Sequence, residues 1–318
     1  MELYMKTTDF FEKWLAIQEP CLARSTYEAY TVYFRKHIEP FFSALDLKEV
    51  KPMDVQQYVT GKLHGGRMDG KSGGLSSVSV KKHLSLLKQC FDSAVIFGYL
   101  PQNPCAAVRL PRRKGGITKR SVLLTAGEAQ RVIDAFEGHP LHVTVVLALY
   151  YGLRRSEVLG LKWSAVDFDR DTLTINHTVV KNLTIEAKDT TKTDTSARTF
   201  ELLPEVKTLL LDHYAARRSD APYIHTWEDG RIFRPDYVTR AFQRVLAAHD
   251  LPRMRFHDLR HSTASILFDM GWGLEDVKNW LGHSDIETTS NIYLHYNRSR
   301  KVLLADRLAG TFQIAKRA

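Results

Sequence analysis

The segment LGHSDIETTSNIYLHY, residues 281–296, is the stretch on which the fold assignment of this chain depends. It places His283 ten residues ahead of Tyr293, with polar residues that favour the start of a helix between them. A tyrosine hydroxyl has a pKa of roughly 10 and is a weak nucleophile unless neighbouring groups assist it. If Tyr293 performs chemistry, other segments of the chain must supply the assisting groups.

The first upstream segment that could do so is YYGLRRSEVLGLKW, residues 150–163. Gly152 is expected to end a buried apolar helix, and Arg154 to project from the turn before the next helix begins near Ser156. A guanidinium in that place can bind two phosphate oxygens at once. Glu157, three residues after Arg154, is expected to orient this guanidinium or to cap the new helix.

The second upstream segment is HDLRHSTASILF, residues 257–268. His257 and Arg260 are three residues apart, so a helix would place an imidazole and a cation on the same face. His261 stands four residues after His257, which raises the alternative of a zinc site. Because the glutamate of a His-Glu-x-x-His motif is absent, we interpret His261 as a structural residue and expect no metal.

Composition predicts a folded chain of two domains, because 318 residues with 44% hydrophobic content can supply two cores. The apolar runs fall short of the roughly 20 residues that span a bilayer, and the acidic N-terminus lacks a secretory signal, so we expect a cytoplasmic protein without a membrane partner. Cys21, Cys90 and Cys105 show no paired spacing and are interpreted as reduced packing residues.

Positive charge is concentrated in the first part of the chain. Residues 1–120 hold 19 Lys and Arg against 11 Asp and Glu, whereas residues 121–318 hold 26 against 25. The stretch RLPRRKGGITKR, residues 109–120, contains six basic residues and no acid, and its Pro111 and Gly-Gly pair disfavour a helix. Such a strip suits the backbone of a polyanion, although an ordinary solvated linker remains equally open. The candidate DNA contacts here are Arg112, Arg113 and Lys114.

The first 110 residues have helical periodicity. Ser25 followed by Glu28 predicts a capping box at one helix start, with aromatic residues behind it on one face. The segment from Ser77 to Leu100 predicts a second helix with an apolar stripe. Three lysines fall mostly off this stripe, where they could face DNA or simply solvent; they are Lys81, Lys82 and Lys88.

A new domain is predicted to begin after the linker, because Thr125 with Glu128 forms another capping box. The segments TLTINHTVV, from Thr172, and ARTFELLP, from Ala197, alternate apolar and polar residues, as strands of a small antiparallel sheet do. Helical patterns then return. The prediction is a helical domain over residues 1–110, a basic linker over 111–120, and a mainly α domain with a small antiparallel β-sheet over 121–318.

The arginine, the His-x-x-Arg pair, the Leu-Gly-His motif and the tyrosine, in this order within one C-terminal domain, resemble the tyrosine recombinase, or phage integrase, family. The resemblance covers essentially the whole chain and implies the two-domain architecture of that family, a helical core-binding domain followed by an α+β catalytic domain. It implies catalytic roles for Arg154, His257, Arg260, His283 and Tyr293.

Two positions in this resemblance have competitors. The family carries a lysine on a β-hairpin, and TKTDTSARTFEL is similar to the form common in integrases of mobile elements, which indicates Lys192 with Lys188 as the weaker candidate. Tyr296 competes for the role of nucleophile. In the family the tyrosine follows a Thr-Thr pair by a few residues and precedes a histidine by two, which fits Tyr293 and His295.

The resemblance implies an enzyme that cuts double-stranded DNA through a 3′-phosphotyrosine and rejoins it without ATP, metal or other cofactor. Members act as homotetramers on paired sites, which is the expected assembly here; a monomer off DNA is an open alternative, and accessory DNA-bending or directionality factors are candidate partners. The tail from Arg298 to Phe312 carries apolar residues and could pack on a neighbouring protomer or on its own domain.

Several alternatives stay open at this level. The lysine box favours integration or excision of a phage or mobile element over resolution of chromosome dimers. A type IB topoisomerase uses similar groups, and a regulator that kept the fold and lost catalysis would bind DNA without cutting it. Many integrases also carry a further N-terminal domain for arm-type sites, and this sequence starts directly at the expected core-binding helices. The DNA sequence that is recognised cannot be read from the chain.

Overall fold

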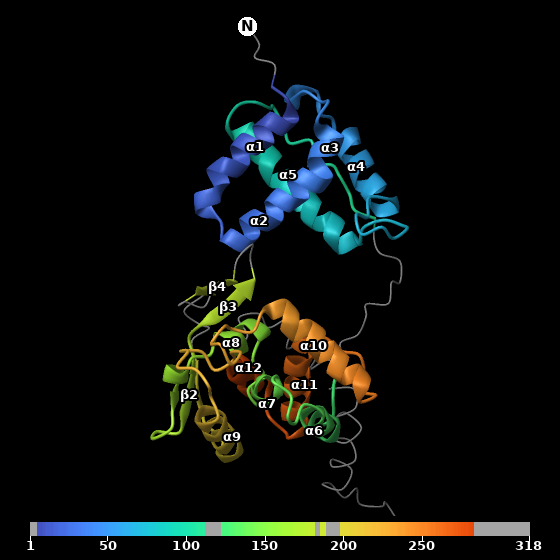
Figure 1. Cartoon of the computed structure of the whole chain (residues 1–318). Coiled ribbons are helices and arrows are strands. Elements are labelled where there is room, and N and C mark those ends of the chain that lie inside the picture. Colours follow the sequence, from blue (N-terminus) through green and yellow to red (C-terminus); the bar gives the residue numbers. More distant parts are fainter. Residues whose placement is uncertain (1–4, 112–121, 182–184, 189–197, 283–318) are drawn as a thin grey trace, which may run out of the picture. The chain divides into compact units, whose positions relative to one another are not determined.

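The computed structural model describes residues 5–111, 122–181, 185–188 and 198–282. The chain divides into two compact units, Met1–Thr118 and Lys119–Ala318, and each has a hydrophobic core of its own (Figure 1). No helix in these described ranges is long and apolar enough to cross a membrane.

Within residues 5–111, the regular elements of the first unit are helices, accompanied by isolated β-bridges. Its elements, in chain order, are α1 (Thr7–Gln18), a 3-10 turn (Glu19–Cys21), α2 (Arg24–Tyr33), a π-helical turn (Phe34–Ile38), α3 (Glu39–Phe42), a 3-10 turn (Leu47–Glu49), α4 (Pro52–His64) and α5 (Ser77–Ile96).

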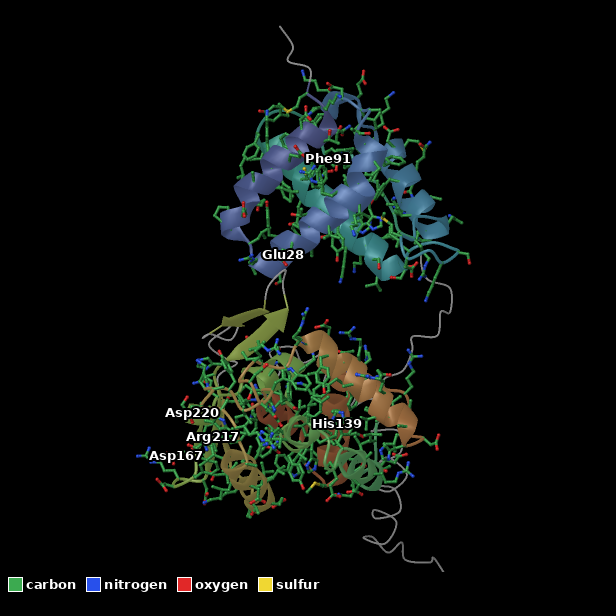
Figure 2. The ribbon with its side chains drawn as sticks, in the orientation of Figure 1. Glu28, Phe91, His139, Asp167, Arg217 and Asp220 are labelled. Carbon is green, nitrogen blue, oxygen red and sulfur yellow. The ribbon has the colours of Figure 1, made fainter. Side chains whose placement is uncertain are left out.

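Helix α5 organises the core of this unit because its apolar stripe contacts both α1 and α4. Val80, Leu87 and Phe91 on this stripe are fully buried, and Figure 2 shows Phe91 in the interior of the helices. Gly98 follows the helix with a φ of 77°, which confirms it as the stop that the sequence predicted. The apolar stripe of the predicted second helix is likewise confirmed.

The predicted capping box at Ser25 is wrong. Helix α2 begins one residue earlier, at Arg24, and its N-cap Ala23 offers no side-chain acceptor. Glu28, at the edge of the unit in Figure 2, instead accepts a bond from Nε of Arg24 at 3.3 Å. An exposed ion pair one turn apart therefore takes the place of the cap, and it satisfies none of the free backbone donors of the first turn.

The second unit combines helices with two small antiparallel sheets. Its elements are α6 (Ala126–Ala135), α7 (His142–Tyr150), α8 (Arg155–Gly160), a 3-10 turn (Trp163–Ala165), β1 (Val166–Asp167), β2 (Thr172–Ile175), β3 (Thr178–Lys181), β4 (Ile185–Lys188), β5 (Arg198–Glu201), α9 (Pro204–Ala215), α10 (Pro235–Ala248), α11 (Phe256–Asp269) and α12 (Leu274–Leu281).

The strands pair in the order β1-β2-β5, with Leu173 opposite Phe200, while β3 and β4 form a separate hairpin. The predicted strand from Thr172 is therefore two strands, β2 and β3, that belong to different sheets. The capping box of Thr125 and Glu128 is confirmed at the start of α6. The predicted fold class, mainly α with a small antiparallel sheet in the C-terminal domain, is confirmed.

Helix α7 lies at the centre of the second unit. Its residues from Val143 to Leu149 are all buried, and α11 packs against it. The hydroxyl of Thr263 on α11 donates to the carbonyl of Leu149 at 2.7 Å, so the two helices are also joined by a buried hydrogen bond. This packing brings the C-terminal end of α7 next to the first turns of α11. The predicted linker limits, 111–120, fall almost entirely outside the described residues and stay a prediction.

Candidate active site

Arg154 lies in the turn between two helices, as the sequence predicted. Helix α7 ends at Tyr150, Gly152 has a φ of 60°, and α8 begins at Arg155. Arg154 is the extended N-cap of α8, and its side chain is 34% exposed. Its guanidinium is thus held at the unit's surface while remaining able to reach an external ligand.

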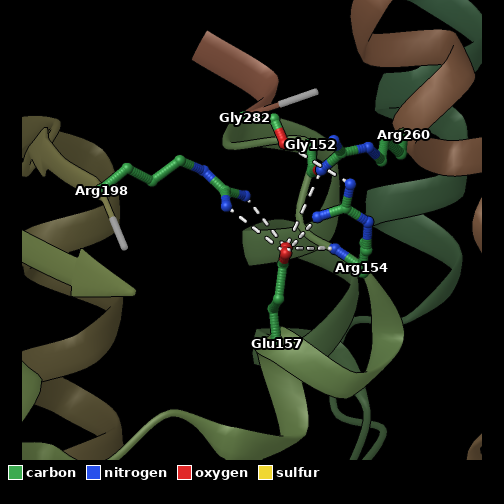
Figure 3. Close-up of polar contacts among 6 residues, drawn as sticks. All are labelled: Gly152, Arg154, Glu157, Arg198, Arg260 and Gly282. Carbon is green, nitrogen blue, oxygen red and sulfur yellow. Dashed lines mark hydrogen bonds and ion pairs between the residues drawn. The ribbon is translucent and has the colours of Figure 1, made fainter. Parts of the chain in front are cut away.

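The carboxylate of Glu157 holds this arginine in place (Figure 3). Its Oε2 accepts the backbone N–H of Arg154 at 2.8 Å, and its Oε1 accepts Nη1 of the same residue at 2.6 Å. Glu157 therefore caps α8 and orients the guanidinium together, whereas the sequence left these two roles as alternatives. Burial would raise the pKa of Glu157, but the charges of Arg198, Arg260 and Arg154 lower it to about 2.

Arg260 reaches the same carboxylate from α11. Its side chain is fully buried, Nη1 donates to the carbonyl of Gly152 at 2.8 Å, and the same atom lies 3.8 Å from Oε2 of Glu157. Burial and the neighbouring charge of Arg154 lower the pKa of Arg260 to about 9, which leaves it charged near neutral pH. A buried cation of this kind is costly to the fold, which points to a functional reason for its presence.

A third guanidinium, that of Arg198, was missed by the sequence reasoning. It is the first residue of β5, its side chain is 9% exposed, and its Nη2 donates to Oε2 of Glu157 at 2.9 Å. The sequence did contain a hint of its role. Arg198 stands at the start of a predicted strand, within the TKTDTSARTFEL segment that was already assigned to the family's lysine-bearing β-hairpin. Three guanidinium groups around one carboxylate leave a surplus of positive charge, which suits a phosphate ligand.

His257 lies in the first turn of α11 and is an exposed residue. Desolvation of the ring and then the nearby charges, including those of Arg260 and Arg154, lower its pKa to about 4. His257 and Arg260 are three residues apart on α11, so they lie about one helical turn from each other. At neutral pH the imidazole is uncharged and can accept a proton. His261 packs edge-on against it at 4.9 Å and is largely buried, as expected of a structural residue.

The Leu-Gly-His segment also reaches this site. Helix α12 ends at Leu281, Gly282 follows in the left-handed conformation, and its carbonyl lies 3.5 Å from Nη2 of Arg154. The backbone therefore meets Arg154 directly before His283. His283, Tyr293, Tyr296 and Lys192 lie outside the described residues, so their roles stay predictions. Lys188 is the last residue of β4 and pairs with Thr178.

The predicted DNA contacts of the first unit are only partly described. Lys81, Lys82 and Lys88 are exposed on α5. Arg112, Arg113 and Lys114 lie outside the described residues. In the part of the chain that the structure describes, no three His, Cys, Asp or Glu side chains gather in a way that could hold a metal ion.

Comparison with known proteins shows which family the chain resembles. Residues 123–300 match the phage integrase family, and residues 8–63 match the N-terminal SAM-like domain of phage integrases. A XerC-like tyrosine recombinase of Caldanaerobacter subterraneus subsp. tengcongensis is 27% identical over 316 residues, which cover 91% of this chain and 78% of that protein. The ICEBs1 integrase of Bacillus subtilis is 27% identical over 299 residues, covering 89% and 77%.

Solved structures show the same fold at lower identity. The Tn1549 transposon integrase in complex with a circular intermediate DNA has a TM-score of 0.78 and 19% identity, covering 94% of this chain and 99% of that one. A lambda integrase tetramer bound to a Holliday junction has a TM-score of 0.71 and 18% identity, covering 92% and 78%. The chain belongs to the phage integrase family, the tyrosine recombinases that cut and rejoin DNA at specific sites.

Proposed function

We propose that this chain is a site-specific integrase in which Tyr293 attacks a DNA phosphodiester, forming a 3′-phosphotyrosine and releasing a 5′-hydroxyl. The bond energy is retained in the phosphotyrosine, so the reverse attack rejoins the strand without ATP. The observation that carries the proposal is the convergence of Arg154 and Arg260 on one buried carboxylate, beside the backbone that leads into His283.

The residues would divide the work as follows. Arg154 and Arg260 stabilise the negative charge that develops on the phosphate oxygens, and His283 donates a further hydrogen bond to one of them. Preorganised donors of this kind are each worth roughly 3–4 kcal/mol of barrier. His257, neutral at physiological pH, accepts the proton of Tyr293. Lys192 protonates the leaving 5′ oxygen, and no metal takes part.

The substrate is double-stranded DNA, and the biological role that we favour is the integration or excision of a phage or mobile element. Relatives named as integrases support this role, among them those of ICEBs1, of Streptomyces ambofaciens and of the prophage phiRv2. We further propose a homotetramer on paired sites in the cytoplasm, with the C-terminal tail exchanged between protomers. Accessory DNA-bending or directionality factors remain part of the proposal.

A suicide substrate with a nick next to the cleavage site tests the nucleophile, because loss of the short fragment traps the covalent adduct. We expect the unaltered chain and Tyr296→Phe to form the adduct and Tyr293→Phe to form none. An adduct with Tyr293→Phe would move the nucleophile elsewhere. A chain that never forms an adduct would support a silent DNA-binding regulator, and relaxation of supercoils without site preference would support a topoisomerase.

A second test concerns the general acid. Lys192→Ala should cleave ordinary DNA slowly and recover when sulfur replaces the 5′ leaving oxygen, because a thiolate leaves without prior protonation. Lys188→Ala is the matched control in the same hairpin segment and should behave like the unaltered chain on both substrates. If Lys192→Ala does not recover on the sulfur substrate, Lys192 is not the general acid. If instead only Lys188→Ala is slow on ordinary DNA and recovers with sulfur, Lys188 is the general acid.

A further inference from the structure

We propose that Arg198 is a positioning residue of this active site, whose guanidinium fixes the Glu157 carboxylate and supports the backbone at Gly282. The inference rests on the proposed function, because it concerns how the two catalytic arginines are held against the phosphate. Arg198 lies in the same TKTDTSARTFEL segment as Lys192, six residues further along the chain, and the family resemblance assigned it no role.

The first step of the argument is the geometry of the shared carboxylate. Arg198 donates from Nη2 to Oε2 of Glu157 at 2.9 Å and from Nη1 to Oε1 at 3.4 Å, so it contacts both oxygens. Figure 3 shows that it enters from the strand side, opposite Arg154 and Arg260. A carboxylate that is held on two sides cannot rotate, which fixes the direction in which the Arg154 guanidinium points.

The second step concerns Arg260. Its Nη1 lies 3.8 Å from Oε2 of Glu157, beyond hydrogen-bond distance, while Arg198 occupies that oxygen at 2.9 Å. Without Arg198, only the backbone N–H and the side chain of Arg154 would hold this carboxylate, and it could turn towards Arg260 to form a close ion pair. Such a pair would neutralise a charge that the proposed chemistry needs at the phosphate. By binding the Glu157 carboxylate, Arg198 prevents this close ion pair. The charge of Arg260 then remains available to the DNA phosphate.

The third step concerns the segment that leads to His283. A Cβ atom added at Gly282 would lie 3.0 Å from Cδ and from Nη1 of Arg198, so this side chain packs against the Gly282 backbone. The Gly282 carbonyl in turn lies 3.5 Å from Nη2 of Arg154. One side chain therefore contacts both the residue that orients Arg154 and the backbone that precedes the family's second histidine.

The test compares Arg198→Lys with the unaltered full-length chain on a suicide substrate in single turnover. Lysine keeps the charge and loses the planar fork, so we expect cleavage to slow by about 10–100-fold, as a misplacement of about 1 Å can do. The dissociation constant for DNA and the melting temperature should change little, because the charge and most of the burial remain. Arg198→Lys combined with Glu157→Gln should be no slower than Glu157→Gln alone, because both act on the same carboxylate.

Two altered substrates distinguish a positioning role from a merely structural one, because a structural defect would slow cleavage of both substrates equally. A methylphosphonate at the scissile position carries no charge, so the placement of the guanidinium groups matters less and the deficit of Arg198→Lys should shrink. A 5′-bridging sulfur should leave the deficit unchanged, because Arg198 does not protonate the leaving group. Arg217→Lys is the matched control. It removes a guanidinium paired with Asp220 at 3.7 Å on the outer side of the second unit (Figure 2), and it should cleave at the normal rate.

The outcomes separate this inference from the proposed function. Normal cleavage by Arg198→Lys, or a deficit that follows the melting temperature and is the same on the methylphosphonate, would overturn the inference while the function stands. An unaltered chain that forms no adduct would overturn the proposed function, and the role of Arg198 with it. A deficit that disappears only with the bridging sulfur would also overturn it, because Arg198 would then be acting as an acid.

Discussion

At the scale of single residues, Glu157 is the group on which most of the site depends. Its folded pKa of about 2 lies below its ordinary value of 4.5, so its ionised form stabilises the fold above roughly pH 4.5. This stabilisation is lost as the pH falls towards 2. We expect Glu157→Gln to lower the free energy of unfolding by about 3–5 kcal/mol at pH 7, because buried guanidinium groups lose their counter-charge.

Urea denaturation of the second unit, which holds four of the five tryptophans, measures this loss. The difference in the free energy of unfolding between Glu157→Gln and the unaltered chain should be smaller at pH 3 than at pH 7, because the stabilisation by the ionised carboxylate is then partly lost. Glu128→Gln is the control, because Glu128 belongs to the exposed capping box of α6, where glutamine also fits, and this change should alter the free energy of unfolding far less. If this difference in the free energy of unfolding were equal at pH 7 and pH 3, the ionised carboxylate of Glu157 would not be the source of the stabilisation.

The lowered pKa of His257 predicts how cleavage responds to acid. With a pKa of about 4, set by desolvation and nearby charges, the free protein keeps this imidazole neutral well below pH 6.5. The second-order rate constant for adduct formation at limiting DNA should therefore hold until about pH 5 and then fall. His261→Gln should show the same fall of the rate constant below about pH 5. His257→Gln should not show it and should lose most of the rate. A rate constant that already falls near pH 6.5 would show that a group other than His257 is the general base.

Residue by residue, the sequence predicted the members of the site that stand in local motifs. Arg154 and Glu157 are three residues apart and meet through one turn of backbone, so their spacing revealed their contact. Arg198 lies far from Glu157 in the sequence, and the two meet only because β5 and α8 share one core. No local pattern encodes that kind of contact, and the full burial of Arg260 was equally beyond reach.

At the scale of secondary-structure elements, Gly152 determines how α7 connects to α8. Its φ of 60° favours glycine, and an added Cβ would lie 2.2 Å from Cδ2 of Leu281 on α12. Its carbonyl also accepts the bond from Arg260. Gly152→Ala should thus destabilise the second unit by about 2–4 kcal/mol through backbone strain and overpacking, and it should slow cleavage.

The matched control is Gly127→Ala in α6, where nothing lies within 4 Å of an added Cβ. That change should stabilise the unit by about 0.5–1 kcal/mol, because alanine favours a helix. Both effects are measured as shifts of the urea midpoint. An equal or greater loss of stability for Gly127→Ala would show that the turn at Gly152 is not special.

The helix caps show why sequence patterns succeed at one place and fail at another. Thr125 and Glu128 form the box that their spacing predicts, because the chain enters α6 in an extended conformation at Thr125. Ser25 and Glu28 have the same spacing, yet the extended residue there is Ala23 and Ser25 already lies inside the helix. The motif fixes which residues could cap. The packing of the preceding segment decides where the first turn begins, and a local pattern does not contain that information.

At the scale of the whole molecule, the excess of positive charge in residues 1–120 is expected to set the salt dependence of DNA binding. Changing Arg112, Arg113 and Lys114 to glutamine should flatten the dependence of log Kd on log salt concentration by about 0.9 for each phosphate that is no longer neutralised. Fluorescence anisotropy over a salt series measures this slope. An unchanged slope would assign the basic linker to ordinary solvated surface.

The lysines of α5 allow the same question to be put to the described part of the first unit. Lys81, Lys82 and Lys88 are exposed on one helix. If they follow a DNA backbone, their joint replacement by glutamine should weaken binding to all sequences alike and lower the salt slope by about 0.9 for each phosphate that they neutralise.

A matched triple separates phosphate binding from net charge. Lys13, Lys48 and Lys51 are exposed lysines of the same unit that lie outside α5. Their replacement by glutamine removes the same formal charge, so long-range attraction falls equally and only direct binding to phosphates differs. We expect this control to leave the salt slope nearly unchanged, while the α5 triple lowers it. Equal slopes for the two triples would mean that α5 faces solvent and that the first unit binds DNA through another surface.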